Sequence, residues 1–165
     1  MPAAGSASVT IEAAPDAVYS LICDVTRTGE WSPECVRCEW IGDTESATPG
    51  ARFRGHNQQG SREWDMECVV DEAEPGASFR FHTERNGTVR TKWGYRLAPE
   101  GTGTRLTEWY ERVAPTPVIT RLVERLVMGG RQKHNDANVA ASLARIKSII
   151  EEAGSYRRPD VDDGR

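Results

Sequence analysis

Residues 9–33 constrain the fold of this chain more than any other segment, because several structural signals follow one another without a spacer. The segment reads VTIEAAPDAVYSLICDVTRTGEWSP. Val9, Ile11 and Ala13 occupy alternate positions, which is the pattern of a half-buried strand. Pro15 suits the first position of a helix, where a missing N–H costs nothing. The chain is therefore expected to open with a strand that leads directly into a helix.

Two short helices are expected between this strand and the turn at Pro33. The first has one apolar side, because apolar residues recur every three or four positions. Trp31 is a large apolar anchor just before the proline, and we expect it at the mouth of a pocket. The recurring apolar residues are Val18, Leu21, Ile22 and Val25.

The middle of the chain is typical of an antiparallel meander, because short β-like segments alternate with turn residues. The strongest turn signal is Asn86-Gly87, since both residues accept a positive φ and so favour a tight hairpin. Together with the first strand, the sheet should have seven strands. We expect the six strands of the meander near 35–42, 51–58, 62–73, 77–84, 89–98 and 104–113.

A long C-terminal helix should follow Pro117, because about 35 residues with helical spacing and no proline extend to residue 153. Its two apolar stripes lie on nearly opposite sides, so a kink or break is expected at Gly129-Gly130. Residues 1–6 are expected to be a flexible N-terminus, and residues 154–165 a disordered tail. Residues 7–153 should form a single domain, which is consistent with a length of 165 residues.

These elements predict an α+β helix-grip fold, in which the sheet curls and the long helix fills its concave side. A curved sheet around one rod leaves a cavity unless large side chains fill it. Such concave apolar sites are where small ligands bind.

Charge and motifs exclude several classes of function. The net charge of −4 gives no basic footprint for nucleic acid. No apolar segment approaches the roughly 20 residues that span a bilayer, and the first residues lack a signal-peptide pattern, so a cytoplasmic protein is expected. Common nucleotide, metalloprotease and hydrolase motifs are missing, and three scattered histidines make a metal triad improbable. We therefore expect no metal and no cofactor.

Cys35 and Cys38 form a C-x-x-C motif without a second ligand pair. Because successive side chains of a strand alternate between faces, we expect these two cysteines on opposite faces of the sheet. They are interpreted as small core residues or free thiols.

The sequence resembles the START-related SRPBCC superfamily, and specifically its bacterial polyketide cyclase/dehydratase-like branch. The resemblance covers about residues 7–152 and implies a seven-stranded sheet around a long helix with a hydrophobic pocket. Members use this pocket variously for lipid or polyketide binding, transport and cyclisation, and no universal catalytic residue carries over. The segments that carry the resemblance are residues 9–33, PGARFRGHNQQGSREWDMECVVDEAEPGASFRFHT, GTRLTEWYE and VAASLARIKSIIEE.

Strand alternation predicts which side chains line the pocket, because the apolar members of each strand share one face while the other face is mostly charged. Residues of the two helical regions complete the set. The expected ligand-binding residues are Trp31, Phe53, Asn57, Trp64, Met66, Phe79, Phe81, Trp93, Tyr95, Tyr110, Leu122, Leu126 and Asn138.

Two residues are candidate catalytic groups. Glu108 falls on the inward face among aromatic residues, where desolvation would raise its pKa; alternatively it lies at the end of the sheet, solvated or paired with Arg112 or Arg131. His134 lies near the edge of a helical stripe and would suit proton transfer near neutral pH; alternatively it is solvated within a polar segment.

The expected function is binding of a hydrophobic aromatic, polyketide-like or lipid molecule, with cofactor-free cyclisation or dehydration as its enzymatic version. In that version Glu108 or His134 removes an α-proton, and Tyr95, Tyr110 or Asn57 steadies the enolate oxygen. The alternatives are a non-catalytic carrier and a protein-interaction module like the chaperone-activating relatives. The charged outer faces of the strands argue against the interaction module. A homodimer is a further possibility, should the turn at Gly129-Gly130 expose an apolar stripe.

Overall fold

Within residues 4–113, 122 and 131–156, which the computed structural model describes, the chain forms a seven-stranded antiparallel sheet. The strand order is β1-β7-β6-β5-β4-β3-β2, so β1 and β2 are the two edges of an open sheet. The elements are β1 (Ala4–Ile11), α1 (Pro15–Ile22), the 3₁₀ helix η1 (Val25–Glu30), β2 (Cys35–Ile41), β3 (Arg52–Gln59), β4 (Arg62–Glu74), β5 (Ser78–Arg85), β6 (Thr88–Glu100), β7 (Gly103–Arg112) and α3 (Arg131–Tyr156).

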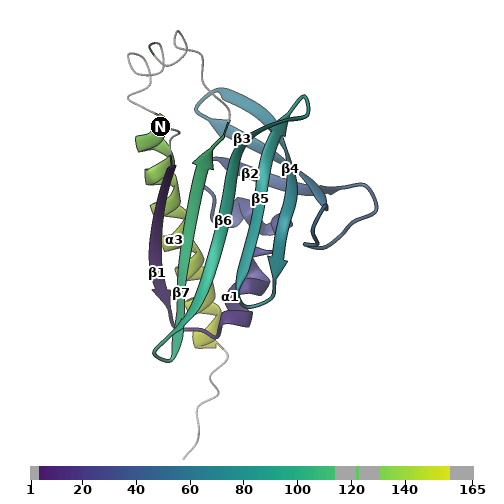
Figure 1. Cartoon of the computed structure of the whole chain (residues 1–165). Helices are drawn as coiled ribbons and strands as arrows, with labels where there is room; N and C mark the ends of the chain where they lie inside the picture. Colours follow the sequence, from purple (N-terminus) through teal and green to yellow (C-terminus); the bar gives the residue numbers. More distant parts are fainter. Residues whose placement is uncertain (1–3, 114–121, 123–130, 157–165) are drawn as a thin grey trace, which may run out of the picture.

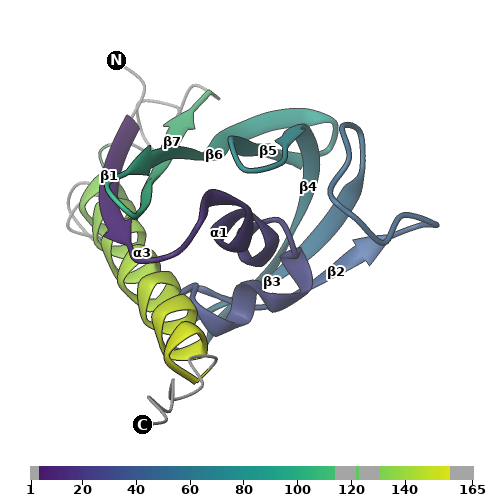
Figure 2. The same cartoon turned by 90° about the horizontal axis from the view of Figure 1, so that it is seen from below.

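The sheet curls around the short helices, and the long helix covers its open side. Figure 1 shows α3 lying along β1 and β7, while Figure 2 shows α1 inside the curve of the sheet. Helix α1 contacts β5, β6 and β7, and η1 packs against β2. This is the helix-grip arrangement that the sequence predicts.

Bulges and tight turns produce the curl. The register shifts in β2 between Cys35 and Arg37, and bulges of this kind bend a strand and increase its twist. The turn between β5 and β6 has positive φ at Asn86 and Gly87, 53° and 70°, which confirms the predicted hairpin.

Helix α3 contributes one apolar face to the core. Val139, Leu143 and Ile146 are buried, at the three- and four-residue spacing that puts side chains on one face. They join the core residues of α1, such as Val18 and Ile22. No helix of the described residues is long and apolar enough to span a membrane.

The first strand begins earlier than the sequence pattern indicates. Residues 4–6, which the sequence predicts to belong to a flexible N-terminus, pair with β7, and the strand ends at Ile11 although the alternation extends to Ala13. These small residues carry no strand pattern, but Gly5 is required here. A Cβ on Gly5 would lie 2.8 Å from the Tyr110 ring and 2.3 Å from Asp136. Tertiary packing therefore extends the strand.

The C-terminal helix also differs from its expected bounds. Helix α3 continues through Gly154 and Ser155, which we placed in a disordered tail. The break expected at Gly129-Gly130 lies outside the described residues, and so does Leu126. Of the apolar stripe that precedes the break, the structure describes Leu122 alone.

Candidate functional site

A cavity of about 180 Å³ lies between the concave face of the sheet, the η1 region and α3. Aromatic side chains form much of its wall, because alternation turns them to the concave face of their strands. Phe53 and Phe81 meet edge to face with ring centroids 5.2 Å apart, and the Phe79 ring packs against Phe81 at an interplanar angle of 38°. The wall is therefore preformed and mainly apolar. Its other aromatic members are Trp31, Trp64, Trp93 and Tyr95.

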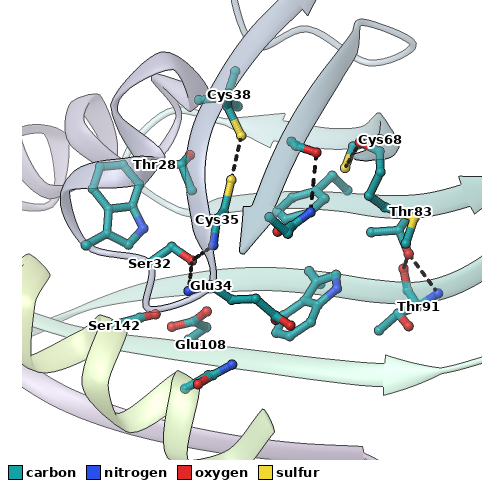
Figure 3. Close-up of a pocket in the computed structure, with 18 of the residues that line it drawn as sticks. Thr28, Ser32, Glu34, Cys35, Cys38, Cys68, Thr83, Thr91, Glu108 and Ser142 are labelled. Atoms are coloured by element: carbon teal, nitrogen blue, oxygen red, sulfur yellow. Dashed lines mark hydrogen bonds between the residues drawn. The ribbon is translucent and has the colours of Figure 1, made fainter. Parts of the chain in front are cut away.

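Polar side chains are distributed around this apolar wall. Figure 3 shows several of them on the loop after η1, on the strands and on α3. A few polar groups in an apolar cavity are what orient a bound small molecule. The polar lining consists of Thr28, Ser32, Glu34, Asn57, Thr83, Thr91, Glu108, Arg112, Asn135, Asn138 and Ser142.

Glu108 is the buried carboxyl group of this cavity. Its residue is 5% exposed, and Figure 3 shows its carboxyl group pointing into the cavity toward Ser142. The Tyr95 hydroxyl donates to Oε1 at 3.3 Å, whereas Oε2 has no hydrogen-bond partner within the part of the chain that the structure describes. An unpartnered buried oxygen is costly unless a ligand or a water satisfies it.

Burial changes the protonation of Glu108. Desolvation raises the pKa of its carboxyl group from 4.5 to about 8, and the hydrogen bond from Tyr95 acts in the opposite direction. At pH 7 the neutral acid therefore outnumbers the carboxylate by roughly ten to one. The side chain is then a hydrogen-bond donor and a potential general acid.

The structure brings most of the sequence-predicted residues together. Trp31 lines the cavity but is only 2% exposed, so it is part of the buried wall rather than an exposed mouth. The predicted residues that line the cavity are Trp31, Phe53, Asn57, Trp64, Met66, Phe79, Phe81, Trp93, Tyr95, Glu108 and Asn138.

Tyr110 has a structural position instead. Its hydroxyl donates to Asp136 Oδ1 at 2.8 Å and approaches the Gln132 carbonyl oxygen at 3.4 Å. Its ring packs on Trp93 with centroids 5.3 Å apart, and it is not among the residues that line the cavity. Tyr110 therefore connects β7 to α3, because the start of the helix covers this position of the strand.

His134 and Leu122 are also separate from the cavity lining. His134 Nε2 lies 3.2 Å from Asn138 Nδ2 and 3.4 Å from Gln59 Nε2, in the first turn of α3. Leu122 is 61% exposed. Residue spacing alone does not determine either position.

The expectation that Cys35 and Cys38 face opposite sides is wrong. Val36 is the extra residue of the β2 bulge and is 56% exposed, so the alternation resumes one position later. Both sulfurs then point to the concave face, 3.3 Å apart, and line the cavity together with Cys68. These cysteines could not be predicted as cavity residues, because nothing in the local sequence marks the bulge. Across residues 4–113, 122 and 131–156, no three His, Cys, Asp or Glu residues are grouped so that they could hold a metal ion.

Comparisons with known proteins agree with the fold. The Polyketide_cyc-like protein Cgl2372 from Corynebacterium glutamicum is 30% identical, with 96% of this chain and 97% of that chain covered and a TM-score of 0.63. No curated protein gives a significant match.

Two aromatase/cyclase structures are similar in fold. Zhui aromatase/cyclase from Streptomyces sp. R1128 is 14% identical, covers 93% of this chain and 96% of its own, and has a TM-score of 0.71. The di-domain aromatase/cyclase StfQ of the steffimycin pathway is 15% identical, covers 94% of this chain and 52% of its own, and has a TM-score of 0.73. At these identities the likeness concerns the fold alone.

A family model described as polyketide cyclase / dehydrase and lipid transport matches residues 2–151, which is nearly the whole sequence. This match shows that the chain belongs to the polyketide cyclase/dehydrase and lipid transport family.

Proposed function

We propose that the cavity binds a compact, hydrophobic, carbonyl-bearing aromatic molecule of polyketide type, and that Glu108 acts on its carbonyl oxygen. The observation that carries the proposal is the Glu108 Oε2 atom, which is buried and has no hydrogen-bond partner among the described residues. It belongs to a cavity whose wall is largely aromatic. As a neutral acid, Glu108 donates the hydrogen bond that a ligand carbonyl accepts.

The size of the cavity supports a compact ligand. Its volume of about 180 Å³ is below the range of about 300–1,000 Å³ that is usual for drug-sized ligands. One or two fused aromatic rings match this space better than a long acyl chain does.

The reaction that suits this arrangement is an intramolecular aldol condensation followed by loss of water. An enol carbon of the ligand attacks a carbonyl carbon, and the new C–C bond forms. Glu108 protonates the carbonyl oxygen, and the proton of the enol hydroxyl group passes to the Glu108 carboxylate that remains. In the second step Glu108 protonates the hydroxyl group as it leaves as water and takes the α-proton. Each step restores the acid, so no cofactor is consumed.

A matched pair of ligands tests binding. 2-Acetonaphthone and 2-ethylnaphthalene differ chiefly in the carbonyl oxygen, and quenching of tryptophan fluorescence reports their affinities. We expect wild type at pH 6.5 to prefer the ketone by roughly 2- to 10-fold, the value of one net hydrogen bond. The preference should disappear in Glu108→Leu and above pH 8, where the carboxylate replaces the donor.

Tyr110→Phe is the control variant, since Tyr110 lies outside the cavity lining and should leave the preference unchanged. A preference that persists in Glu108→Leu, or failure of both naphthalenes to bind, contradicts the proposal.

Chemistry is tested separately with an aryl poly-β-ketone and chromatography of its cyclised products. Binding with no acceleration by wild type over Glu108→Leu would leave a carrier rather than an enzyme.

A further inference from the structure

We infer that Cys35 and Cys38 are a redox-active thiol pair in the cavity wall, and that hydrogen peroxide converts them to an intramolecular disulfide. The inference is independent of the role proposed for Glu108. It rests on the position of two sulfurs that the regular alternation of a strand would have separated.

The local geometry holds the sulfurs together. The bulge at Val36 turns both cysteines to the concave face, where Cys35 Sγ and Cys38 Sγ are 3.3 Å apart (Figure 3). Gly55 faces them from β3: a Cβ there would lie 3.4 Å from one sulfur and 3.6 Å from the other. The absence of this side chain leaves room for the pair. A disulfide has an S–S distance of about 2.05 Å, so the sulfurs must approach by roughly 1.3 Å.

The two thiols are not equivalent. A hydrogen bond between the thiols lowers the pKa of Cys35 and raises that of Cys38, with burial opposing the first shift and adding to the second. Cys35 is therefore the thiol that ionises first and attacks an oxidant, and Cys38 is the partner that resolves the product. Burial raises the pKa of the third cavity cysteine, Cys68, which makes it the less reactive thiol.

The cavity provides the route for the oxidant. Both thiols are buried from bulk solvent, yet both line a cavity of about 180 Å³, and peroxide is scarcely larger than water. Cys23 is half-buried and is not among the residues that line this cavity. A ligand that fills the cavity should consequently shield the pair.

The chemistry balances in two steps. The Cys35 thiolate attacks one oxygen of hydrogen peroxide, the O–O bond breaks, and a sulfenic acid and hydroxide form. The hydroxide takes up the proton that the Cys35 thiol released on ionising, which gives the first water. The Cys38 sulfur then attacks the Cys35 sulfur, the S–O bond breaks, and the hydroxyl leaves as water with the Cys38 proton. Overall the two thiols lose two electrons and peroxide is reduced to two waters.

Mass spectrometry tests the inference on the purified chain. Arg37 lies between the cysteines, so trypsin separates them into peptides 28–37 and 38–52, whereas Cys23 and Cys68 fall in peptides 1–27 and 63–80. After limited peroxide treatment, alkylation and denaturing digestion, we expect peptides 28–37 and 38–52 as a linked pair that dithiothreitol releases. Cys35 should be oxidised at least about tenfold faster than Cys68, because its thiolate fraction is larger.

Three variants make the result decisive. Cys38→Ser, or Cys38→Ala should the first not fold, removes the resolving thiol, so Cys35 should persist as a sulfenic acid that dimedone traps. Cys23→Ser and Cys68→Ser should still form the link. The inference is overturned if Cys35 stays reduced while Cys23 or Cys68 reacts. It is equally overturned if the link joins Cys35 to Cys68, or if Cys35 over-oxidises at the same rate with and without Cys38.

Discussion

Burying a carboxyl group in a largely apolar cavity costs free energy, and Glu108 is such a group. Within the described part of the chain, Tyr95 supplies the one hydrogen bond to its carboxyl group, and desolvation keeps that group neutral at pH 7. A neutral buried acid costs less than a buried carboxylate and supplies a donor to a carbonyl ligand. The group that we propose to contact the ligand should therefore also make the stability of the protein depend on pH.

The stability of the protein should fall between pH 5 and pH 8 because of Glu108. The pKa of Glu108 is about 8 in the folded protein and 4.5 in the unfolded chain. As the pH rises, the unfolded chain releases this proton first, and the free energy of unfolding falls. Glu108→Gln removes the titrating group, so its stability should not change with pH for this reason. Relative to wild type, the variant should gain roughly 3 kcal/mol of unfolding free energy from pH 5 to pH 8 in urea titrations. An equal difference at both pH values would show that Glu108 titrates normally.

Tyr95 and Tyr110 should behave differently although both are buried tyrosines of neighbouring strands. Tyr95→Phe removes the donor that lowers the pKa of Glu108, so the Glu108 midpoint should rise by a few tenths to about one unit. Tyr110→Phe loses its hydrogen bond to Asp136 and should cost about 1 kcal/mol of stability without moving that midpoint. Carbon NMR of the glutamate side chains measures the midpoints, and equal shifts in both variants would contradict this assignment.

Among the secondary-structure elements, β2 with its bulge and the closely packed η1 form one side of the cavity. Gly29 of η1 lies against the backbone of β2, where a Cβ would be 2.4 Å from the Val36 carbonyl oxygen. The bulge that exposes Val36 also brings Cys35 and Cys38 together. A change in the distance between η1 and β2 should therefore move the cavity-lining side chains of β2.

Substituting Gly29 with alanine should destabilise the protein by about 1–3 kcal/mol, because a backbone atom cannot move aside as a flexible side chain can. Gly154→Ala is the matched control: Gly154 lies in α3 with no atom within 4 Å of a built Cβ, so alanine should stabilise by up to about 1 kcal/mol. Thermal unfolding of both variants checks the pair. A neutral Gly29→Ala would mean that η1 and β2 are not packed so closely.

In the fold taken together, the sheet and its inward face could be predicted from the sequence, because alternation and turn residues act locally. Phe53, Trp64 and Phe79 reach the cavity as expected, and Asn86-Gly87 forms its hairpin. Features that depend on tertiary packing could not be predicted in this way. The Val36 bulge has no local signal, and the course of α3 decides that Tyr110 contacts the helix and that His134 does not line the cavity.

The most direct test of the central claim is the ¹³C chemical shift of the Glu108 carboxyl carbon followed through a pH titration, with Glu108→Gln used to assign the signal. The claim is that the aromatic cavity holds a carboxylic acid that is neutral at pH 7. A midpoint near pH 8 is the predicted result, in agreement with desolvation as the dominant cause. A midpoint near 4.5, the ordinary value for glutamate, would contradict the account, because the cavity would then present a carboxylate to its ligand.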